Sequence, residues 1–265
     1  MTRIWPWVRN SLAVALCAWL AWGLFHREFW SAWRDLHGTW MLLALGTTLA
    51  TLFVRVMKWH LLLSEEKLPR NGRESARALL GGYALASITP GRVGDLSRCM
   101  FMREGRRGRT LLFTFVDKMF DVWAVLGFAV LSLFLFLPRV YALAAAAGWV
   151  ALVPLFICSG RWVRHASHHS SHLERFRSFW EAFTSVSAGC FGGWALCSSA
   201  LDMVTLFCLL RAFHDTGFKV ALVSYPWMVI AGALPLSLGG VGPREGLSAL
   251  LLPFFSISRV AAVNI

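Results

Sequence analysis

The chain has 265 residues, of which 57% are hydrophobic and only 15% are charged, and its formal net charge is +12 at pH 7. Soluble domains carry about 25% charged residues, so this composition excludes an ordinary soluble protein and indicates a membrane protein. The six cysteines form no Cys-x-x-Cys pair and mostly fall in apolar runs. Neither a disulfide framework nor a zinc site is therefore predicted.

Several apolar runs approach or exceed the roughly 20 residues that a helix needs to cross a bilayer. In chain order they are residues 11–25, 39–63, 111–137, 140–158 and 186–213. The first follows a basic start, but Trp19, Trp22 and Phe25 stand where a signal-peptide cleavage site needs small residues, so we interpret it as an uncleaved anchor. The sequence predicts an all-α polytopic membrane protein, with about five spanning helices in one integral membrane domain over 1–265 and no soluble catalytic domain.

Two further apolar segments are interrupted by proline and glycine. The first, 76–98, is broken within "SITPGRVGDLSR" (87–98), and the second, 220–257, within "ALPLSLGGVGPREG" (233–246). Backbone freed from helical hydrogen bonds cannot face lipid, since each unsatisfied group there costs several kcal/mol. We therefore predict two re-entrant helical hairpins of opposite orientation that resemble an inverted repeat. The alternative is that glycine and proline only kink continuous spanning helices.

The distribution of Lys and Arg supports the first hairpin. If 76–96 enters the membrane and returns to the same side, most basic residues fall on the side of the N-terminus, whereas a full crossing would make the two sides nearly equal. The positive-inside rule thus predicts a multi-pass membrane protein with a cytoplasmic N-terminus. Anionic lipid headgroups account for the basic excess, so no nucleic-acid partner is predicted.

Some ionisable residues lie within the apolar runs, where an isolated charge costs about 2.5–3.5 kcal/mol and should face inward and be paired. Asp117 and Asp121 in "FVDKMFDVW" share one helical face and would repel each other without a cation between them. Arg92 and Arg98 are the candidates for that cation.

The other charges near the ends or middle of apolar runs receive simpler interpretations. Structural ion pairs are expected for Lys118 and Asp202. Arg55 and Lys58 are expected to extend to the cytoplasmic surface, which gives them no assigned role.

One stretch of the sequence is rich in histidine. The stretch "RHASHHSSH" could place four histidines on one helical face, as a zinc or pH-sensing cluster would, but no nearby acid or cysteine completes it and a solvated loop is favoured. These are His165, His168, His169 and His172.

The sequence contains no Ser-His-Asp order of a catalytic triad, no Walker loop and no His-Glu-x-x-His motif. No catalytic residue, metal or cofactor is predicted.

Four motifs in this order resemble the lysylphosphatidylglycerol synthase transmembrane family. They are "RVMKWHLLL" (55–63), "TPGRVGDLSR" (89–98), "VDKMFD" (116–121) and "LPLSLGGVGPREG" (234–246). The family includes the flippase domain of the multiple-peptide-resistance proteins and stand-alone relatives, some of them associated with hopanoid or other lipid pathways. The resemblance implies a helical bundle with two oppositely oriented re-entrant helices and a role in moving lipid between leaflets.

The motif matches also imply a headgroup-binding site. Its charged members are Arg92, Asp95, Arg98, Asp117, Asp121, Arg244 and Glu245, and the glycines Gly239, Gly240 and Gly242 would add backbone N–H groups. Asp95 stands where the family usually has Glu. The aminoacyl-transferase domain of the full-length synthases is absent, which argues against lipid lysylation. Relatives typically continue beyond the second break, so a minimal or truncated form is expected.

The resulting hypothesis is translocation or binding of a lipid, such as a phospholipid, with an anionic or zwitterionic headgroup at the midplane. The alternatives are a membrane-embedded transferase acting on a lipid-linked substrate, with Asp95, Asp121 or Glu245 as general base, and a scaffold for a lipid-modifying enzyme. Membrane lipids are the predicted partners, and a lipid-modifying enzyme is a further candidate partner.

Overall fold

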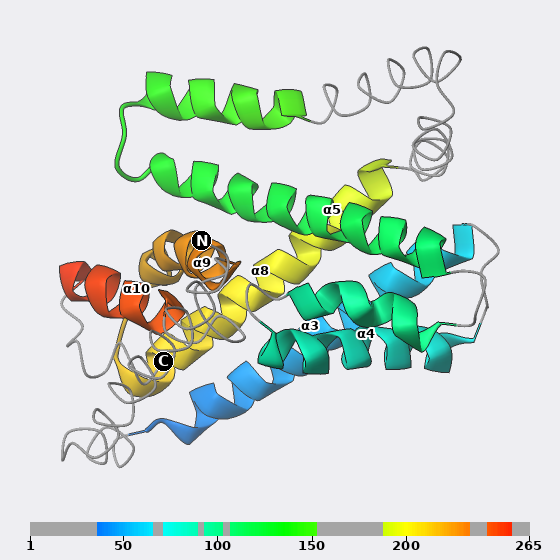
Figure 1. Cartoon of the computed structure of the whole chain (residues 1–265). Helices are drawn as coiled ribbons and strands as arrows, with labels where there is room; N and C mark the ends of the chain where they lie inside the picture. Colours follow the sequence, from blue (N-terminus) through cyan, green and yellow to red (C-terminus); the bar gives the residue numbers. More distant parts are fainter. Residues whose placement is uncertain are drawn as a thin grey trace, which may run out of the picture. The chain divides into compact units, whose positions relative to one another are not determined.

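A computed structural model describes residues 36–65, 71–89, 93–102, 107–152, 188–233 and 243–255. Within these ranges every regular element is a helix and none is a strand, which confirms the predicted all-α class (Figure 1). The elements are α3 (Gly38–Glu65), α4 (Gly72–Ile88), η1 (Val93–Phe101), α5 (Arg107–Leu133), α8 (Ala188–Phe213), α9 (Phe218–Ala233), α10 (Pro243–Leu251) and η2 (Leu252–Phe255). A further apolar helix covers Arg139–Leu152.

Among the described residues, two segments are long and apolar enough to cross a membrane: Gly38–Ser64 in α3 and Gly189–Phe213 in α8. At 1.5 Å per residue each is about 40 Å long, which exceeds the hydrocarbon core. Large apolar side chains such as Leu42, which is 71% exposed, cover the outside of α3. Such a surface is typical of a helix in contact with lipid. Two of the predicted runs, 39–63 and 186–213, therefore form spanning-length helices.

The remaining predicted runs have different outcomes. The run 111–137 falls largely within α5, which is long enough to span but carries charges. The run 140–158 begins within the helix Arg139–Leu152, and the run 11–25 lies outside the described residues.

The chain forms two compact units. Unit 1 comprises Met1–Thr51, Gly82–Asp95 and Ala200–Ile265, and unit 2 comprises Leu52–Gly81 and Leu96–Ser199. The helices α3, α4, η1 and α8 each contribute to both.

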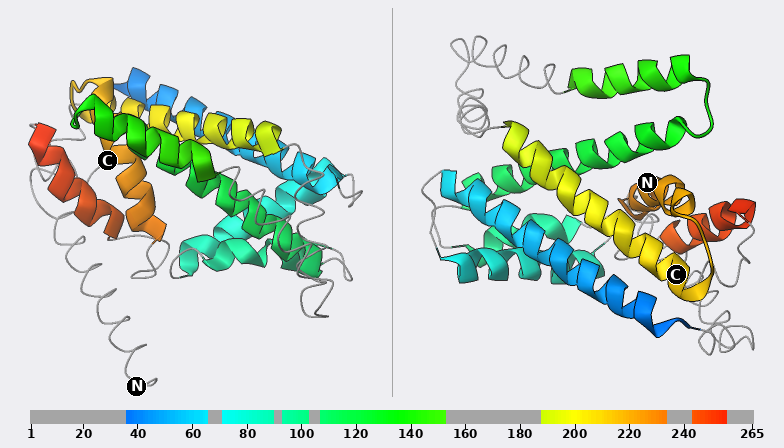
Figure 2. Two further views of the ribbon diagram at one scale, coloured as in Figure 1. Left: turned by 90° about the horizontal axis from the view of Figure 1, so that it is seen from above. Right: turned by 180° about the vertical axis from the view of Figure 1, so that it is seen from behind.

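In unit 1 the first part of α3 lies beside the second part of α8 (Figure 2). The Trp40 and Phe207 rings meet edge to face with their centroids 5.7 Å apart. The hydroxyl of Thr205 donates to the hydroxyl of Thr47 at 2.8 Å. Aromatic and hydroxyl contacts of this kind join apolar helices where the hydrophobic effect between them is weak.

In the C-terminal part of unit 1, most side chains of helix α9 are buried. Helices α10 and η2 pack against it. It has 16 residues and is therefore about 24 Å long, shorter than the bilayer core. Pro226 inside α9 has no N–H and so removes one helical hydrogen bond. Helix α10 begins at Pro243, a position where a missing N–H has no cost. Of the second predicted break, within 233–246, residues 234–242 lie outside the described residues.

The first predicted break coincides with the end of α4 at Ile88, and η1 begins at Val93. Gly94 lies directly against the last turn of α4, because a Cβ placed on it would be 2.3 Å from the carbonyl carbon of Leu85. The Gly94 N–H donates to the Thr89 hydroxyl at 2.7 Å, and that hydroxyl donates to the Leu85 carbonyl at 2.9 Å. The chain therefore turns back at this point, and only glycine fits the approach.

In unit 2, η1 and α4 are also in contact. The Phe101 ring at the end of η1 lies against Gly81 of α4, since a Cβ on that glycine would be 2.5 Å from the ring. Helix Arg139–Leu152 similarly runs back beside α5 (Figure 1). The Trp149 and Trp123 rings stack there with centroids 4.5 Å apart, and the Trp149 indole N–H donates to the Trp123 carbonyl.

Candidate functional site

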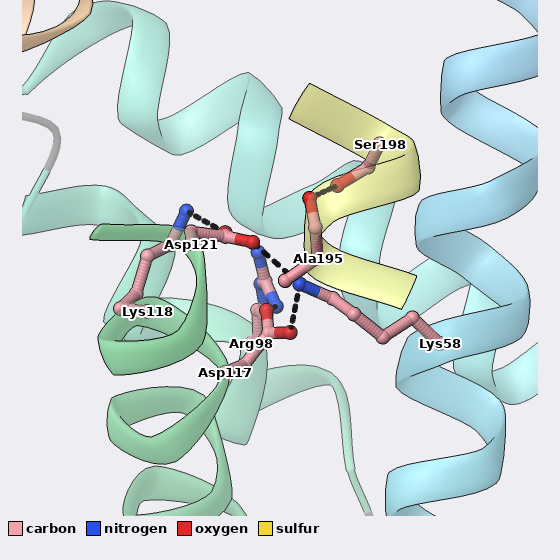
Figure 3. A network of polar contacts seen from close by, with 7 residues as sticks. All are labelled: Lys58, Arg98, Asp117, Lys118, Asp121, Ala195 and Ser198. Carbon is pink, nitrogen blue, oxygen red and sulfur yellow. Dashed lines mark hydrogen bonds and ion pairs between the residues drawn. The ribbon is translucent and has the colours of Figure 1, made fainter. Parts of the chain in front are cut away.

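A continuous line of alternating charges joins α3, η1 and α5 within unit 2 (Figure 3). The Lys58 ammonium of α3 lies 2.8 Å from Asp117 Oδ1 and 2.5 Å from Asp121 Oδ1. The Arg98 guanidinium of η1 donates to Asp117 Oδ2 at 2.7 Å. The Lys118 ammonium lies 3.7 Å from Asp121 Oδ2. We call Arg98, Asp117, Lys58, Asp121 and Lys118, in this order, the charge chain.

The spacing of the residues on α5 explains how the charge chain forms. Asp117 and Asp121 are four residues apart, so their side chains project from one face on successive turns. Lys118 is three residues before Asp121 and reaches it along the same helix. Lys58 belongs to a different helix, and its flexible four-carbon stem lets one ammonium contact both carboxylates.

Burial decreases along the charge chain from one end to the other. The side chains of Arg98 and Lys58 are 0% and 2% exposed, whereas those of Asp121 and Lys118 are 25% and 33% exposed. Buried charges persist only when they are paired, because taking an ion out of water costs several kcal/mol. The contact between Asp121 and Lys118 is partly exposed and contributes little. The inner contacts therefore dominate the energetics.

The guanidinium of Arg98 also packs on an aromatic ring of α3. Its central carbon lies 5.0 Å from the centroid of Trp59, a fully buried residue next to Lys58. A cation over an indole face gains about 2 kcal/mol when both groups are desolvated. Arg98 thus fastens η1 to α3 through the indole ring and to α5 through Asp117.

The model of the lysylphosphatidylglycerol synthase TM region family matches residues 7–265 of the sequence. The chain belongs to this family. The resemblance indicated by the four motifs is thereby confirmed, and with the two spanning-length helices it indicates a membrane location. The family suggests a function related to membrane lipids. A search of the curated proteins returned no match, and neither did a search of the solved structures.

In this member of the lysylphosphatidylglycerol synthase TM family, the cation between the two α5 carboxylates is a lysine. The prediction that a cation lies between Asp117 and Asp121 is confirmed. Among the described residues Lys58 contacts both carboxylates, whereas Arg98 contacts Asp117 alone, and Arg92 lies outside the described residues. The expectation that Lys58 extends to the membrane surface is wrong, because two carboxylates hold its ammonium in the interior. The sequence signal for this role was a lysine within an apolar helix in the first family motif.

Two other expectations about the charge chain are confirmed. Arg98 does pair with Asp117, and Lys118 does form an ion pair, with Asp121. Both expectations rested on the cost of leaving a charge unpaired in the membrane.

The other predicted headgroup-binding residues belong to unit 1 or lie outside the described residues. Asp95 is buried and belongs to unit 1, as does Arg244, which is exposed at the start of α10. The backbone of Glu245 follows in the same helix, and Asp202 lies in α8. Outside the described residues are Arg92, Gly239, Gly240, Gly242 and the four histidines His165, His168, His169 and His172.

The geometry of the charge chain favours ion pairing over acid–base chemistry. Asp117 has one oxygen on Lys58 and the other on Arg98, and Asp121 has one on Lys58 and the other on Lys118. A carboxylate whose two oxygens both contact cations is poorly placed to accept a proton from a substrate. Over the ranges that the structure describes, no group of three His, Cys, Asp or Glu side chains could hold a metal ion.

Proposed function

We propose that this protein moves a lipid with an anionic or zwitterionic headgroup from one leaflet to the other. The observation that carries the proposal is the turn at Gly94, where the chain reverses against the end of α4. Helix α4 has 17 residues and is about 26 Å long, so a reversal there in a membrane protein calls for polar surroundings. A lipid headgroup in a wet cavity supplies such surroundings.

The second interrupted segment supports the same interpretation. Helix α9 is short and largely buried, and α10 starts anew at Pro243. We infer that α4 with η1, and α9 with α10, are re-entrant hairpins that enter from opposite faces as an inverted repeat. Paired interrupted helices of this kind mark midplane binding sites in transporters.

In the proposed mechanism the phosphate of the headgroup binds between the two hairpins. Arg92, Arg98 and Arg244 attract it, and the N–H groups of Gly239, Gly240 and Gly242 complete the site. Asp95, Asp117 and Glu245 hold the arginines in place, and Asp121 holds Lys58. The acyl chains remain in lipid, and movement of one hairpin exposes the headgroup to the other leaflet. We place the protein as a multi-pass domain in the bacterial inner membrane with a cytoplasmic N-terminus.

The contacts of Asp121, which is one of the three candidate general bases beside Asp95 and Glu245, support the transport hypothesis. Its two oxygens contact Lys58 and Lys118, so this candidate base is already engaged. A transferase would also leave a chemically changed lipid, which a transport assay can detect.

The purified protein in vesicles is expected to move fluorescent phosphatidylglycerol across the bilayer without altering it chemically. Dithionite quenching measures the movement, and mass spectrometry of the recovered lipid tests for chemical change. The Arg92→Ala/Arg244→Ala variant is expected to be about tenfold slower or more, because a hydrogen bond to a charged group contributes roughly 1.5–3 kcal/mol.

Arg139→Ala is the matched control, since Arg139 is exposed on the helix Arg139–Leu152 and has no place in the proposed site. It is expected to transport at the wild-type rate. Wild-type transport by the double variant would refute the site, and a modified lipid would support the transferase.

A further inference from the structure

Each inner ion of the charge chain has two partners of opposite charge. Asp117 contacts both Arg98 and Lys58, and Lys58 contacts both Asp117 and Asp121. Asp121 in turn contacts Lys58 and Lys118. An isolated ion pair has no such redundancy, so this arrangement needs an explanation beyond simple neutralisation.

The redundancy changes the cost of opening one contact. If Arg98 leaves Asp117, the carboxylate keeps its 2.8 Å contact with Lys58. Without Lys58, the same movement would separate Asp117 from its cation in the protein interior, which costs several kcal/mol. Lys58 therefore makes the contact between Arg98 and Asp117 exchangeable.

We propose that Lys58 is a positioning residue for transport, which holds Asp117 while Arg98 exchanges that carboxylate for the phosphodiester of a lipid. This inference rests on the proposed function, in which Arg98 binds the headgroup. A phosphodiester can take the place of a carboxylate because both present two oxygens to the planar guanidinium. Each ion has an opposite partner before and after the exchange.

The position of Arg98 couples this exchange to movement of the first hairpin. The Arg98 side chain is 0% exposed and lies over Trp59, so a phosphate reaches it only if η1 shifts relative to α3 and α5. Lys58 and Asp117 stay behind on α3 and α5 as a pair. Binding of the headgroup and displacement of η1 are then one event.

The test measures binding of dihexanoyl-phosphatidylglycerol to purified variants in detergent by calorimetry, with inorganic phosphate as a second ligand. Lys58→Met keeps the length of the side chain and removes its charge. Its Kd for the lipid is expected to rise about thirtyfold or more, because Asp117 then holds Arg98 with no substitute cation. Lys58→Arg keeps the charge and is expected to stay within about threefold of the wild type.

A second substitution separates this role from a merely structural one. In Lys58→Met/Asp117→Asn the carboxylate that competes for Arg98 is gone, so the Kd is expected to be at least about tenfold lower than that of Lys58→Met alone. A structural lysine would affect the folded fraction but not the Kd of the folded protein. Arg139→Met is the control, since it removes an exposed cation that lies outside the charge chain, and its Kd should not change.

The outcomes distinguish this inference from the proposed function. Transport by the wild type together with an unchanged lipid Kd in Lys58→Met would overturn the role of Lys58 and leave the proposed function standing. If the wild type does not transport, the proposed function fails, and the Kd series alone decides the exchange at Arg98. Equal affinity for inorganic phosphate and lipid would identify a free anion as the ligand, and no binding of either would overturn the inference.

Discussion

Replacing Gly94 with alanine is expected to lower the midpoint of thermal unfolding in detergent by about 5–10 °C. The added methyl group would lie 2.3 Å from the carbonyl carbon of Leu85 and 2.4 Å from the amide nitrogen of Ala86. Both are backbone atoms of α4, which cannot rotate away as a side chain can. Overpacking of this kind costs about 1–3 kcal/mol or more, and 1 kcal/mol corresponds to about 2–4 °C in a protein of this size class.

The measurement is the fraction of protein that survives heating, followed by fluorescence-detected size exclusion. Gly46→Ala is the control, because a Cβ on this helical residue of α3 would have nothing within 4 Å and alanine favours a helix. It should leave the midpoint unchanged or raise it slightly. An unchanged midpoint in Gly94→Ala would show that the turn does not depend on close contact between η1 and α4.

Replacing Asp117 with asparagine is expected to destabilise the protein more than any other single change in the charge chain. The substitution keeps the size of the side chain but removes the charge that both Lys58 and Arg98 contact. Removing one partner from a buried ion pair costs about 3–5 kcal/mol. The expected fall in the unfolding midpoint is roughly 10 °C or more.

Asp121→Asn provides the comparison, because it removes the same charge from the same helix four residues later. Its side chain is 25% exposed, and Lys58 would keep Asp117 as a partner. Partly exposed ion pairs contribute about 1 kcal/mol or less, so the midpoint should change by a few degrees at most. Equal losses in the two variants would contradict the gradient of burial along the charge chain.

The sequence alone determined the features that depend on local composition. Uninterrupted apolar length predicted the spanning helices at 39–63 and 186–213, and proline with glycine predicted the end of the helix before residue 90. These predictions succeeded because helix length, hydrogen-bond loss at proline and transfer of apolar residues to lipid are properties of short segments. The four motifs likewise identified the family.

Only the tertiary structure decided how the charges are paired. Periodicity placed Asp117 and Asp121 on one face of α5, but it could not say which helix covers that face. The partner proved to be Lys58, which is 63 residues away from Asp121 in the sequence and was expected at the membrane surface. Whether a lysine reaches water or stays inside depends on the carboxylates that packing brings to it, because the energy of a buried charge is set by its neighbours.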